Sequence, residues 1–447
     1  MRHPSYAIAD ADLAMLTDLY QLTMLQAYWV EGLQERATFS LFYRRLPATR
    51  RFMLACGQQY AAELATRLHF NDAHLASLAD TGQFRDDFLA WLGQWRFTGD
   101  IWTLPEGTPV FENEPFMEVD ATLAEAQLLE SLVMNLVQLE TVIASKAVRV
   151  VLAAGGRPVM DFGLRRMHGT DAAVRGVRAY RTAGLAGTSN VLGGLRHDMP
   201  LSGTMAHSYI LAHDDEEAAF AAFARHYPGT TLLVDTHDTL AGVAKVIALM
   251  DADPEIRVGA IRLDSGDLGT LAREARSRLD AAGYPEVKVV ASSGLDEWKI
   301  AELVAAGAPI DAFGVGTEMG VSSDAPVIDL SYKLVEYAGI PRVKHSPGKI
   351  NLPCRKQLYR RRDDRGRYVG DVIALRDETI DAGEPLLRPL VRTGRLDDDE
   401  MARADEARER VADTLERFPE DVRRLAKGES DYPVTLSPGL ERLQSRT

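Results

Sequence analysis

Short apolar runs alternate with segments of helical period through the middle of the chain, and each apolar run ends in a cluster of polar residues. The runs occupy residues 158–166, 200–208, 231–238, 258–269, 287–294 and 310–317. Alanine- and leucine-rich helical segments follow at 216–225, 239–250, 268–282 and 296–306. Units of a strand, a polar tip and a helix that recur every ~30 residues are typical of parallel sheets, so we predict a series of βα units.

Parallel strands joined by helices form either a closed barrel or an open doubly wound sheet. In both architectures the functional side chains collect at the carboxyl ends of the strands. Nearly every unit of this chain carries polar residues at its tip, and no G-x-G-x-x-G fingerprint follows the early strands. The pattern therefore favours an α/β fold with an irregular parallel α/β barrel.

The segments on either side of the barrel have a different pattern. Residues 1–122 mix helical periodicity with period-two alternation, as at 37–44, and are predicted to form an N-terminal α+β domain. The barrel is predicted to span residues 123–325 and to begin with a long helix. Residues 326–447 contain further strand patterns, which we expect to return to the N-terminal domain, and end in a solvated helix of alternating acids and arginines.

Composition and charge exclude several classes of protein. The chain has 447 residues and a net charge of −14, which argues against a general nucleic-acid or membrane-surface binder but leaves room for a locally positive pocket. No apolar run reaches the ~18 residues of a membrane span, so we expect a cytoplasmic protein without a membrane partner. The two cysteines, Cys56 and Cys354, are too far apart in sequence to suggest a zinc knuckle, and we expect reduced packing residues.

One predicted strand delivers an arginine, two carboxylates and glycines to a single edge. Arg262 interrupts an apolar run, and Asp264 and Asp267 follow it with Ser265 and Gly266 between them. Carboxylates bind hydroxyl groups or a divalent cation, and the start of the next helix offers free backbone N–H groups. This combination suits the binding of an anionic sugar phosphate.

His207 is the most distinctive single candidate for chemistry. It follows the small residues of Gly203-Thr204-Met205-Ala206 at the end of a predicted strand, where a bulky ligand has room to approach. An imidazole in that setting attacks a phosphoryl group, acts as acid or base, or binds a metal. Asp235 ends a nearby predicted strand and would orient or stabilise a charged His207 if the two strands are adjacent.

Two further kinds of tip complete the candidate site. Arg165 and Arg166 follow the aromatic Phe162, a combination that suits a planar, negatively charged ring. The last two tips place glycines where backbone amides can close around a phosphate, which in barrels commonly lies after the final strands. The residues concerned are Ser293, Gly294, Gly316 and Thr317.

Taken together, these motifs resemble the nicotinate phosphoribosyltransferase family. The likeness runs from TDLYQLTM at 17–24 to PCRKQLYR at 353–360, with FGLRR at 162–166, GTMAHS at 203–208, LVDT at 233–236, RLDSGD at 262–267 and GVGT at 314–317 between them. The resemblance implies that nicotinate and phosphoribosyl pyrophosphate give nicotinate mononucleotide and pyrophosphate. It also implies Mg²⁺, coupled ATP hydrolysis as in a ligase, and a homodimer with a shared active site.

The resemblance implies roles for individual residues as well. His207 would be phosphorylated by ATP, with Asp235, Arg262 and Asp264 as the other catalytic residues. Tyr20, from the neighbouring subunit, and Phe162 would sandwich the pyridine ring. Asp264 would hold the ribose hydroxyls. Further substrate contacts are implied for Arg165, Arg166, Ser189, Thr204, Ser265, Gly266, Asp267, Ser293, Gly294, Gly316 and Thr317.

Three alternatives remain beside this interpretation. The related nicotinamide-using enzymes present an aspartate where this chain has Ser189, and a carboxylate there would repel nicotinate. A nucleotide-binding barrel without turnover would keep the fold and lose residues at the tips. A quinolinate-decarboxylating transferase would need more basic groups. One departure from the family pattern is Cys354, which stands where we expect glycine in the last of these motifs, at 353–360.

Overall fold

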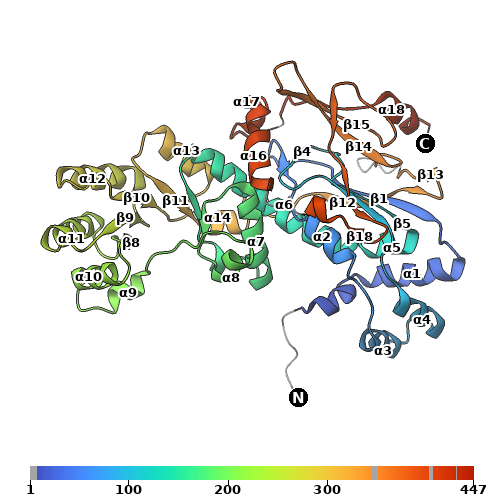
Figure 1. Ribbon diagram of the computed structural model, residues 1–447, viewed down its shortest axis with the longest axis horizontal. Helices are drawn as coiled ribbons and strands as arrows, with labels where there is room; N and C mark the ends of the chain where they lie inside the picture. Colours follow the sequence, from blue (N-terminus) through green and yellow to red (C-terminus); the bar gives the residue numbers. More distant parts are fainter. Residues whose placement is uncertain (1–7, 345–350, 402–405, 429, 447) are drawn as a thin grey trace. The chain divides into compact units, whose positions relative to one another are not determined.

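The computed structural model describes residues 8–344, 351–401, 406–428 and 430–446, and it divides into two compact units. The first, called the terminal unit here, combines residues 1–142 with 327–447. The second, the central unit, is formed by residues 143–326. Both are drawn in Figure 1. The domain limits expected from the sequence, after residues 122 and 325, stay predictions.

The terminal unit is built on antiparallel sheets that join both ends of the chain. Its largest sheet has the order β13-β12-β1-β5-β3-β17-β18. Strand β1 (Arg36–Tyr43) pairs with β12 (Leu330–Tyr337) on one side and with β5 (Met117–Thr122) on the other. The ring of Phe39 on β1 stacks on that of Tyr332 on β12, with centroids 5.0 Å apart. The predicted return of the C-terminal strands to the N-terminal domain is confirmed.

The remaining strands and helices of the terminal unit surround this sheet. A second sheet has the order β16-β14-β15-β19, and β2 pairs with β4. The strands are β2 (Met53–Leu54), β3 (Asp100–Thr103), β4 (Pro109–Val110), β13 (Ile340–Pro341), β14 (Lys356–Arg362), β15 (Tyr368–Leu375), β16 (Gly383–Pro385), β17 (Arg388–Arg392), β18 (Arg395–Leu396) and β19 (Val434–Leu436). The helices are η1 (Asp10–Met15), α1 (Leu19–Glu31), α2 (Gln58–Ala65), α3 (Asp72–Asp80), α4 (Asp86–Gln94), α5 (Leu123–Leu128), α15 (Asp398–Met401), α16 (Glu406–Arg417), α17 (Glu420–Arg423) and α18 (Pro438–Gln444).

The central unit contains one parallel sheet of six strands, in the order β7-β6-β11-β10-β9-β8. The strands are β6 (Val159–Asp161), β7 (Gly187–Thr188), β8 (Thr230–Leu233), β9 (Val258–Leu263), β10 (Lys288–Ala291) and β11 (Ala312–Val315). The helices are η2 (Leu164–Arg166), α7 (Thr170–Ala183), α8 (Val191–Arg196), α9 (His207–Leu211), α10 (Glu216–His226), α11 (Thr239–Ala252), α12 (Leu268–Ala281), α13 (Glu297–Ala305) and α14 (Thr317–Gly320). Helix α6 (Glu130–Ala153) runs from the terminal unit into the central unit.

The predicted combination of a parallel α/β barrel and an α+β domain is confirmed, with the barrel realised as a curled half-barrel. Strands β7 and β8 form the two edges of the sheet and are not paired with each other. Helices α10, α11 and α12 pack against β8, β9 and β10, as Figure 1 shows. The carboxyl ends of the strands therefore lie at one edge of the sheet, as is usual for βα units.

Aspartates start four successive helices of the central unit. Asp215, Asp238, Asp267 and Asp296 precede α10, α11, α12 and α13, and each carboxylate accepts a hydrogen bond from the backbone N–H three residues later. Such caps satisfy an amide that the helix leaves unpaired. They explain why the helical segments begin where the sequence pattern predicts.

The strand expected at 200–208 does not form. Leu201 makes only an isolated bridge to Thr188 of β7, and α9 begins at His207. Pro200 and Gly203 interrupt the segment, because proline lacks an N–H donor and glycine has no side chain to pack in a strand. His207 is consequently the first residue of a short helix and not the last residue of a strand.

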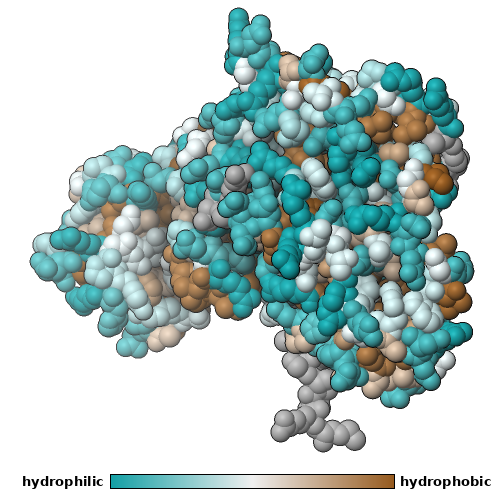
Figure 2. Space-filling model, turned by 45° about the vertical axis from the view of Figure 1, so that its right-hand side comes forward, coloured by the Kyte–Doolittle hydropathy of each residue, from teal (hydrophilic) through white to brown (hydrophobic). Residues whose placement is uncertain are grey.

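Hydrophilic residues cover much of the face shown in Figure 2, with smaller hydrophobic patches between them. This surface fits the charged composition of the sequence. Among the described residues, no helix combines the length and apolar character needed to cross a membrane.

Candidate active site

A cavity of about 860 Å³ opens at the carboxyl ends of the central strands, and we call it the parallel-sheet cavity. Its volume lies within the range of ~300–1,000 Å³ that is usual for small-molecule sites. Twelve of the residues singled out from the sequence lie on its wall: Phe162, Arg165, Arg166, Ser189, Thr204, His207, Arg262, Asp264, Ser293, Gly294, Gly316 and Thr317. Residues scattered over more than 150 positions of the sequence thus meet in one place.

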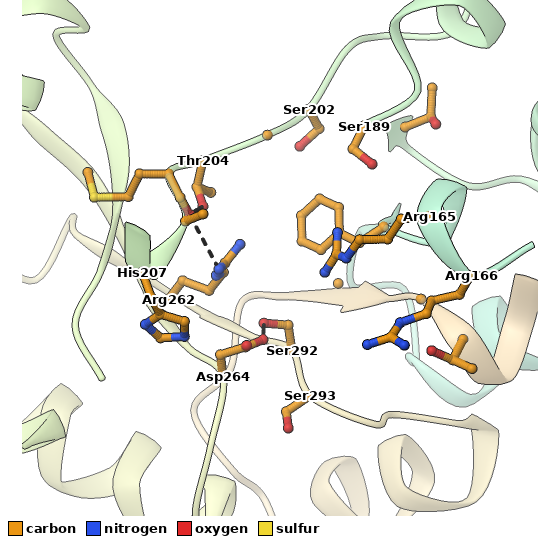
Figure 3. A pocket seen from close by; sticks show the side chains of 18 of the residues that line it. Arg165, Arg166, Ser189, Ser202, Thr204, His207, Arg262, Asp264, Ser292 and Ser293 are labelled. Carbon is orange, nitrogen blue, oxygen red and sulfur yellow. Dashed lines mark hydrogen bonds between the residues drawn. The ribbon is translucent and has the colours of Figure 1, made fainter. Parts of the chain in front are cut away.

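Charged side chains enter the cavity from two opposite sides. Figure 3 shows Arg165 and Arg166 on one side and His207, Arg262 and Asp264 on the other. Arg165 and Arg166 are exposed, and no carboxylate in the described part of the chain pairs with either of them. With three arginines and one aspartate on its wall, the cavity is cationic within a protein of net charge −14. Such a cavity concentrates anionic ligands.

Arg262 is the most constrained of the three arginines. Its Nη2 donates to the carbonyl oxygen of Met205 at 3.5 Å, and its guanidinium lies 5.9 Å from the centre of the Phe162 ring. Its Nε is buried without a hydrogen-bond partner. Burial lowers the pKa of Arg262, the charges of Asp264 and Asp235 raise it, and Arg165 lowers it. The guanidinium stays charged, because even a lowered arginine pKa lies far above neutral pH.

The backbone beside Phe162 is fixed by a buried carboxylate. Asp161, at the end of β6, accepts hydrogen bonds from the hydroxyl of Thr188 at 2.6 Å and from the N–H of Gly163 at 2.7 Å. Asp161 is 1% exposed, and burial raises its pKa. These bonds tie the tip of β6 to β7 and hold Phe162 at the cavity wall.

Gly314 on β11 allows Phe162 its position. A Cβ atom at Gly314 would lie 2.6 Å from Phe162 Cδ2 and even closer to Cε2, well inside ordinary contact distance. The glycine at this position therefore provides the space that the ring occupies. Gly203, also on the cavity wall, has no atom within 4 Å of such a Cβ.

A threonine holds the imidazole of His207. His207 Nδ1 lies 3.1 Å from Thr236 Oγ1, and we expect Nδ1–H to donate to the hydroxyl, which leaves Nε2 as an acceptor. Asp235, which the sequence suggested as the orienting group, instead accepts from the Asp264 N–H at 3.1 Å and from the Ser265 hydroxyl at 2.6 Å. The orienting contact comes from the residue after Asp235.

The carboxyl ends of β9 and β10 are held by short local contacts. The Ser292 hydroxyl donates to the Asp264 carboxylate and links β10 to the tip of β9. Ser293 and Gly294 follow with φ angles of +94° and +54°, and the value at Ser293 is unusual for a residue that is not glycine. Uncommon backbone angles persist where the surroundings impose them, and they concentrate at ligand sites. This turn therefore supports a binding role for the end of β10.

Five of the predicted site residues are not among those that line the parallel-sheet cavity. Asp235 and Ser265 bond to each other, Gly266 has a φ of +77°, and Asp267 caps α12 through Thr270. The hydrogen bonds from Thr270 lower the pKa of Asp267. Tyr20 lies on α1 of the terminal unit and is 48% exposed.

Several wall residues were missed by the sequence analysis. Thr188, Ser202 and Ser292 lie on the wall, and Thr236 contacts His207. The available signal was a polar residue at the end of a short apolar run, one position after it for Ser292 and two positions after it for Thr236. Thr188 gave no such signal, because β7 has only two residues.

Asp264 on the cavity wall and its neighbour Asp235 fit a metal ion that is carried by phosphates. No group of three or more histidines, cysteines or acids suited to a metal occurs among the residues that the structure describes. Asp235 Oδ1, however, is buried without a hydrogen-bond partner close to Asp264. Mg²⁺ is usually held by one or two carboxylates together with substrate phosphates and water, so these two residues fit it.

Two family models match this chain. The model described as the nicotinate phosphoribosyltransferase N-terminal domain matches residues 15–138, and the model of the nicotinate phosphoribosyltransferase family matches residues 158–337. The second match contains every residue on the wall of the parallel-sheet cavity.

Individual proteins are similar to the chain over most of its length. The nicotinate phosphoribosyltransferase pncB2 of Mycobacterium tuberculosis is 48% identical, over 95% of this chain and 91% of that protein. The nicotinate phosphoribosyltransferase of Bacillus subtilis is 39% identical, over 84% of this chain and 79% of that protein. The crystal structure of human nicotinic acid phosphoribosyltransferase has a TM-score of 0.83 at 26% identity, covering 96% of this chain and 99% of the human one.

Proposed function

Because the chain belongs to the nicotinate phosphoribosyltransferase family, we propose that the parallel-sheet cavity transfers phosphoribose from phosphoribosyl pyrophosphate to nicotinate. The products are nicotinate mononucleotide and pyrophosphate, in NAD salvage. The observation that carries this proposal is the convergence of Arg165, Arg166 and Arg262 on one cavity beside the ring of Phe162. Both substrates are anions, and an acidic protein binds them only where it presents local positive charge.

Nicotinate is proposed to bind between Phe162 and Arg262. The Phe162 ring offers a stacking surface, and the Arg262 guanidinium offers donors that match a carboxylate. Thr204 and Ser189 add hydroxyl groups on the same wall. Tyr20 of a second copy would cover the other face of the pyridine ring, a role supported by its 48% exposure.

Phosphoribosyl pyrophosphate is proposed to bind along the ends of β9, β10 and β11. Asp264, held by Ser292, would accept hydrogen bonds from the ribose hydroxyls. The 5-phosphate would be bound by Ser293, Gly294, Gly316 and Thr317, which lie together on the wall. The backbone geometry of Ser293 and Gly294 supports this assignment.

The transfer itself needs positioning and charge compensation more than covalent groups. The pyridine nitrogen forms a bond to ribose C1 while the bond from C1 to the pyrophosphate oxygen breaks, and the electron pair leaves with pyrophosphate. Positive charge develops on the ribose beside the Asp264 carboxylate, and negative charge develops on the leaving group near Arg165 and Arg166. Mg²⁺, when bound, neutralises phosphate oxygens, and Asp235 and Asp264 would hold it.

Coupling to ATP is proposed to proceed through His207, which would make the enzyme a ligase by class. Nε2 of His207 attacks the γ-phosphorus of ATP and ADP leaves, and hydrolysis of the phosphohistidine later releases inorganic phosphate. Thr236 supports this role because it engages Nδ1 and leaves Nε2 available. The phosphoryl group would add negative charge beside Arg262, whose guanidinium would compensate it.

The assembly and the location of the protein are also proposed. A homodimer with a shared site is supported by apolar side chains that are exposed beside the cavity, Val191 and Leu201, and on α1, Leu19 and Tyr20. Large exposed apolar surface commonly marks an interface. A cytoplasmic location stays a prediction.

The nicotinamide-using alternative is disfavoured by Ser189. Its hydroxyl lies on the cavity wall, where an aspartate in its place would repel the carboxylate of nicotinate. A catalytically inactive barrel is disfavoured because His207, Arg262 and Asp264 are all present on one wall. A quinolinate transferase would need to bind a second carboxylate.

Product analysis tests the proposal. Purified protein is mixed with phosphoribosyl pyrophosphate, Mg²⁺ and either nicotinate or nicotinamide, with and without ATP. We expect nicotinate mononucleotide, a higher kcat/KM for nicotinate, and stimulation by ATP. His207→Ala should abolish the stimulation and leave a slow basal transfer. Unchanged ATP coupling in His207→Ala rejects the phosphohistidine, and a preference for nicotinamide rejects the substrate assignment.

A further inference from the structure

A second cavity, of about 380 Å³, lies in the terminal unit, and the proposed transfer reaction makes no use of it. Its wall includes Tyr28, Trp29, Trp91 and Trp95, so three of the five tryptophans of the chain surround one space. They come from α1, from α4 and from the residue that follows α4. We call this space the tryptophan cavity.

The aromatic walls are anchored from behind. Phe88, which is fully buried, contacts Trp29 edge-on at 6.3 Å and stacks on Trp91 at 5.6 Å between ring centres. Trp95 packs edge-on against Phe70 at 6.3 Å. Rings held in this way form a preformed surface, which suits a planar ligand and limits the entropy lost on binding.

One polar group of a wall residue is without a partner. The indole Nε1–H of Trp95 is buried and makes no hydrogen bond in the described part of the chain, although Trp95 is only 4% exposed. Buried donors are nearly always satisfied by protein, water or ligand, so this donor on a wall residue still lacks an acceptor.

The free hydrogen-bonding groups on the wall favour an anion over a cation. Arg96 donates from Nη1 to the carbonyl oxygens of Trp95 at 2.6 Å and Gly93 at 3.3 Å, and no carboxylate in the described residues pairs with it. Glu125 is the acid on the wall, but its carboxylate already accepts from the Thr98 N–H, the Thr98 hydroxyl and the Thr122 N–H. Aromatic cages bind cations, but here the acceptor positions of Glu125 are occupied, whereas Arg96 keeps N–H donors that suit an anion.

We propose that the tryptophan cavity is a second ligand site, which binds a planar aromatic carboxylate. The ring would lie among the tryptophans, and the carboxylate oxygens would accept hydrogen bonds from Arg96 and from Trp95 Nε1–H. Neither interaction involves the parallel-sheet cavity, so the proposal stands apart from the transfer reaction.

Binding of indole-3-carboxylate to the full chain tests the proposal, measured by calorimetry and by quenching of tryptophan fluorescence. We expect saturable binding that weakens at least 10-fold in Arg96→Gln, which removes the charge, and several-fold in Trp95→Phe, which keeps a ring and removes the donor. Arg45→Gln, a matched change at another exposed arginine of the terminal unit, should bind as the original protein does.

Four results would overturn the proposal. The first is no saturable binding by the original protein. The second is equal affinity in Arg96→Gln and Arg45→Gln. The third is loss of binding in Arg165→Gln with no loss in Arg96→Gln, which would assign the ligand to the parallel-sheet cavity. Choline serves as the cationic probe, and tighter binding of choline than of indole-3-carboxylate would also reject an anion site.

Discussion

Replacing Gly314 by alanine should displace Phe162 from the wall of the parallel-sheet cavity. The added Cβ would lie 2.6 Å from Phe162 Cδ2, whereas carbon atoms pack at about 3.5–4.0 Å. The ring must therefore move by roughly 1 Å, because Gly314 sits on a central strand and its backbone cannot yield. The same movement would disturb the contact between Phe162 and Arg262.

The expected magnitude follows from this displacement. Misplacing a reacting group by about 1 Å can cost about 100-fold in rate, so we expect kcat/KM for nicotinate to fall about 10- to 100-fold in Gly314→Ala. The KM for phosphoribosyl pyrophosphate should change much less, because Phe162 faces the pyridine end of the proposed site. The backbone at Gly314 lies outside the left-handed region, so alanine is not excluded by its φ angle.

Steady-state kinetics with each substrate varied in turn measure the effect. Gly203→Ala is the matched control, since Gly203 lies on the same wall and its Cβ would meet no atom within 4 Å. Thermal unfolding of both variants checks that the fold is retained. A well-folded Gly314→Ala with the same KM and kcat as Gly203→Ala would refute the role of Phe162 in nicotinate binding.

Three further predictions concern other groups. Thr236→Val should lower the ATP-dependent rate about 2- to 13-fold, the equivalent of about 0.5–1.5 kcal/mol for one hydrogen bond to His207. Thr236→Ser keeps the hydroxyl and should retain the rate. Equal losses in both variants would contradict the role of Thr236 in holding the imidazole. Cys354 has a φ of +60°, so Cys354→Gly should relieve about 1–2 kcal/mol of backbone strain. The greater backbone entropy of glycine in the unfolded chain offsets about 0.5–1 kcal/mol of this gain. Denaturation with urea should detect the net increase in the free energy of unfolding. Burial, followed by the charge of Asp371, raises the pKa of Glu114 well above its usual range. The folded state therefore retains a proton that the unfolded chain loses, and this contribution to stability is lost as the pH rises toward the folded pKa. Glu114→Gln should remove this pH dependence of the free energy of unfolding and should be more stable than the original protein at pH 8. An unchanged pH dependence would show that Glu114 is ionised when folded.

The repeating units of the central unit were predictable because each unit carries its own local signals. Apolar strands of four to six residues lead to an aspartate that caps the following helix, as Asp267 does for α12. Strand β7 escaped prediction because a two-residue strand has no measurable period. The 200–208 segment was misread because its small residues resemble a strand tip, although Pro200 and Gly203 prevent pairing.

The candidate site was predictable at the level of strand tips and less so at the level of single contacts. Because parallel strands end at one edge, His207, Arg262 and Asp264 were expected together, and they share one cavity. The partner of His207 depends on side-chain direction, which a sequence pattern does not encode. Asp235 and Thr236 are neighbours in sequence, and their side chains make different contacts, one with Ser265 and the other with the imidazole.

The pairing of β1 with β12 sets an order for synthesis on the ribosome. Strand β1 is made within the first 43 residues, but the strand that covers its edge is not made until residues 330–337. The central unit needs no residue outside 143–326 for its sheet, so it can complete that sheet first. The nascent N-terminal segment meanwhile presents the edge of β1 without its final neighbour, and unpaired edges invite association between chains. Chaperone demand during translation should therefore be greatest before residue 337 emerges.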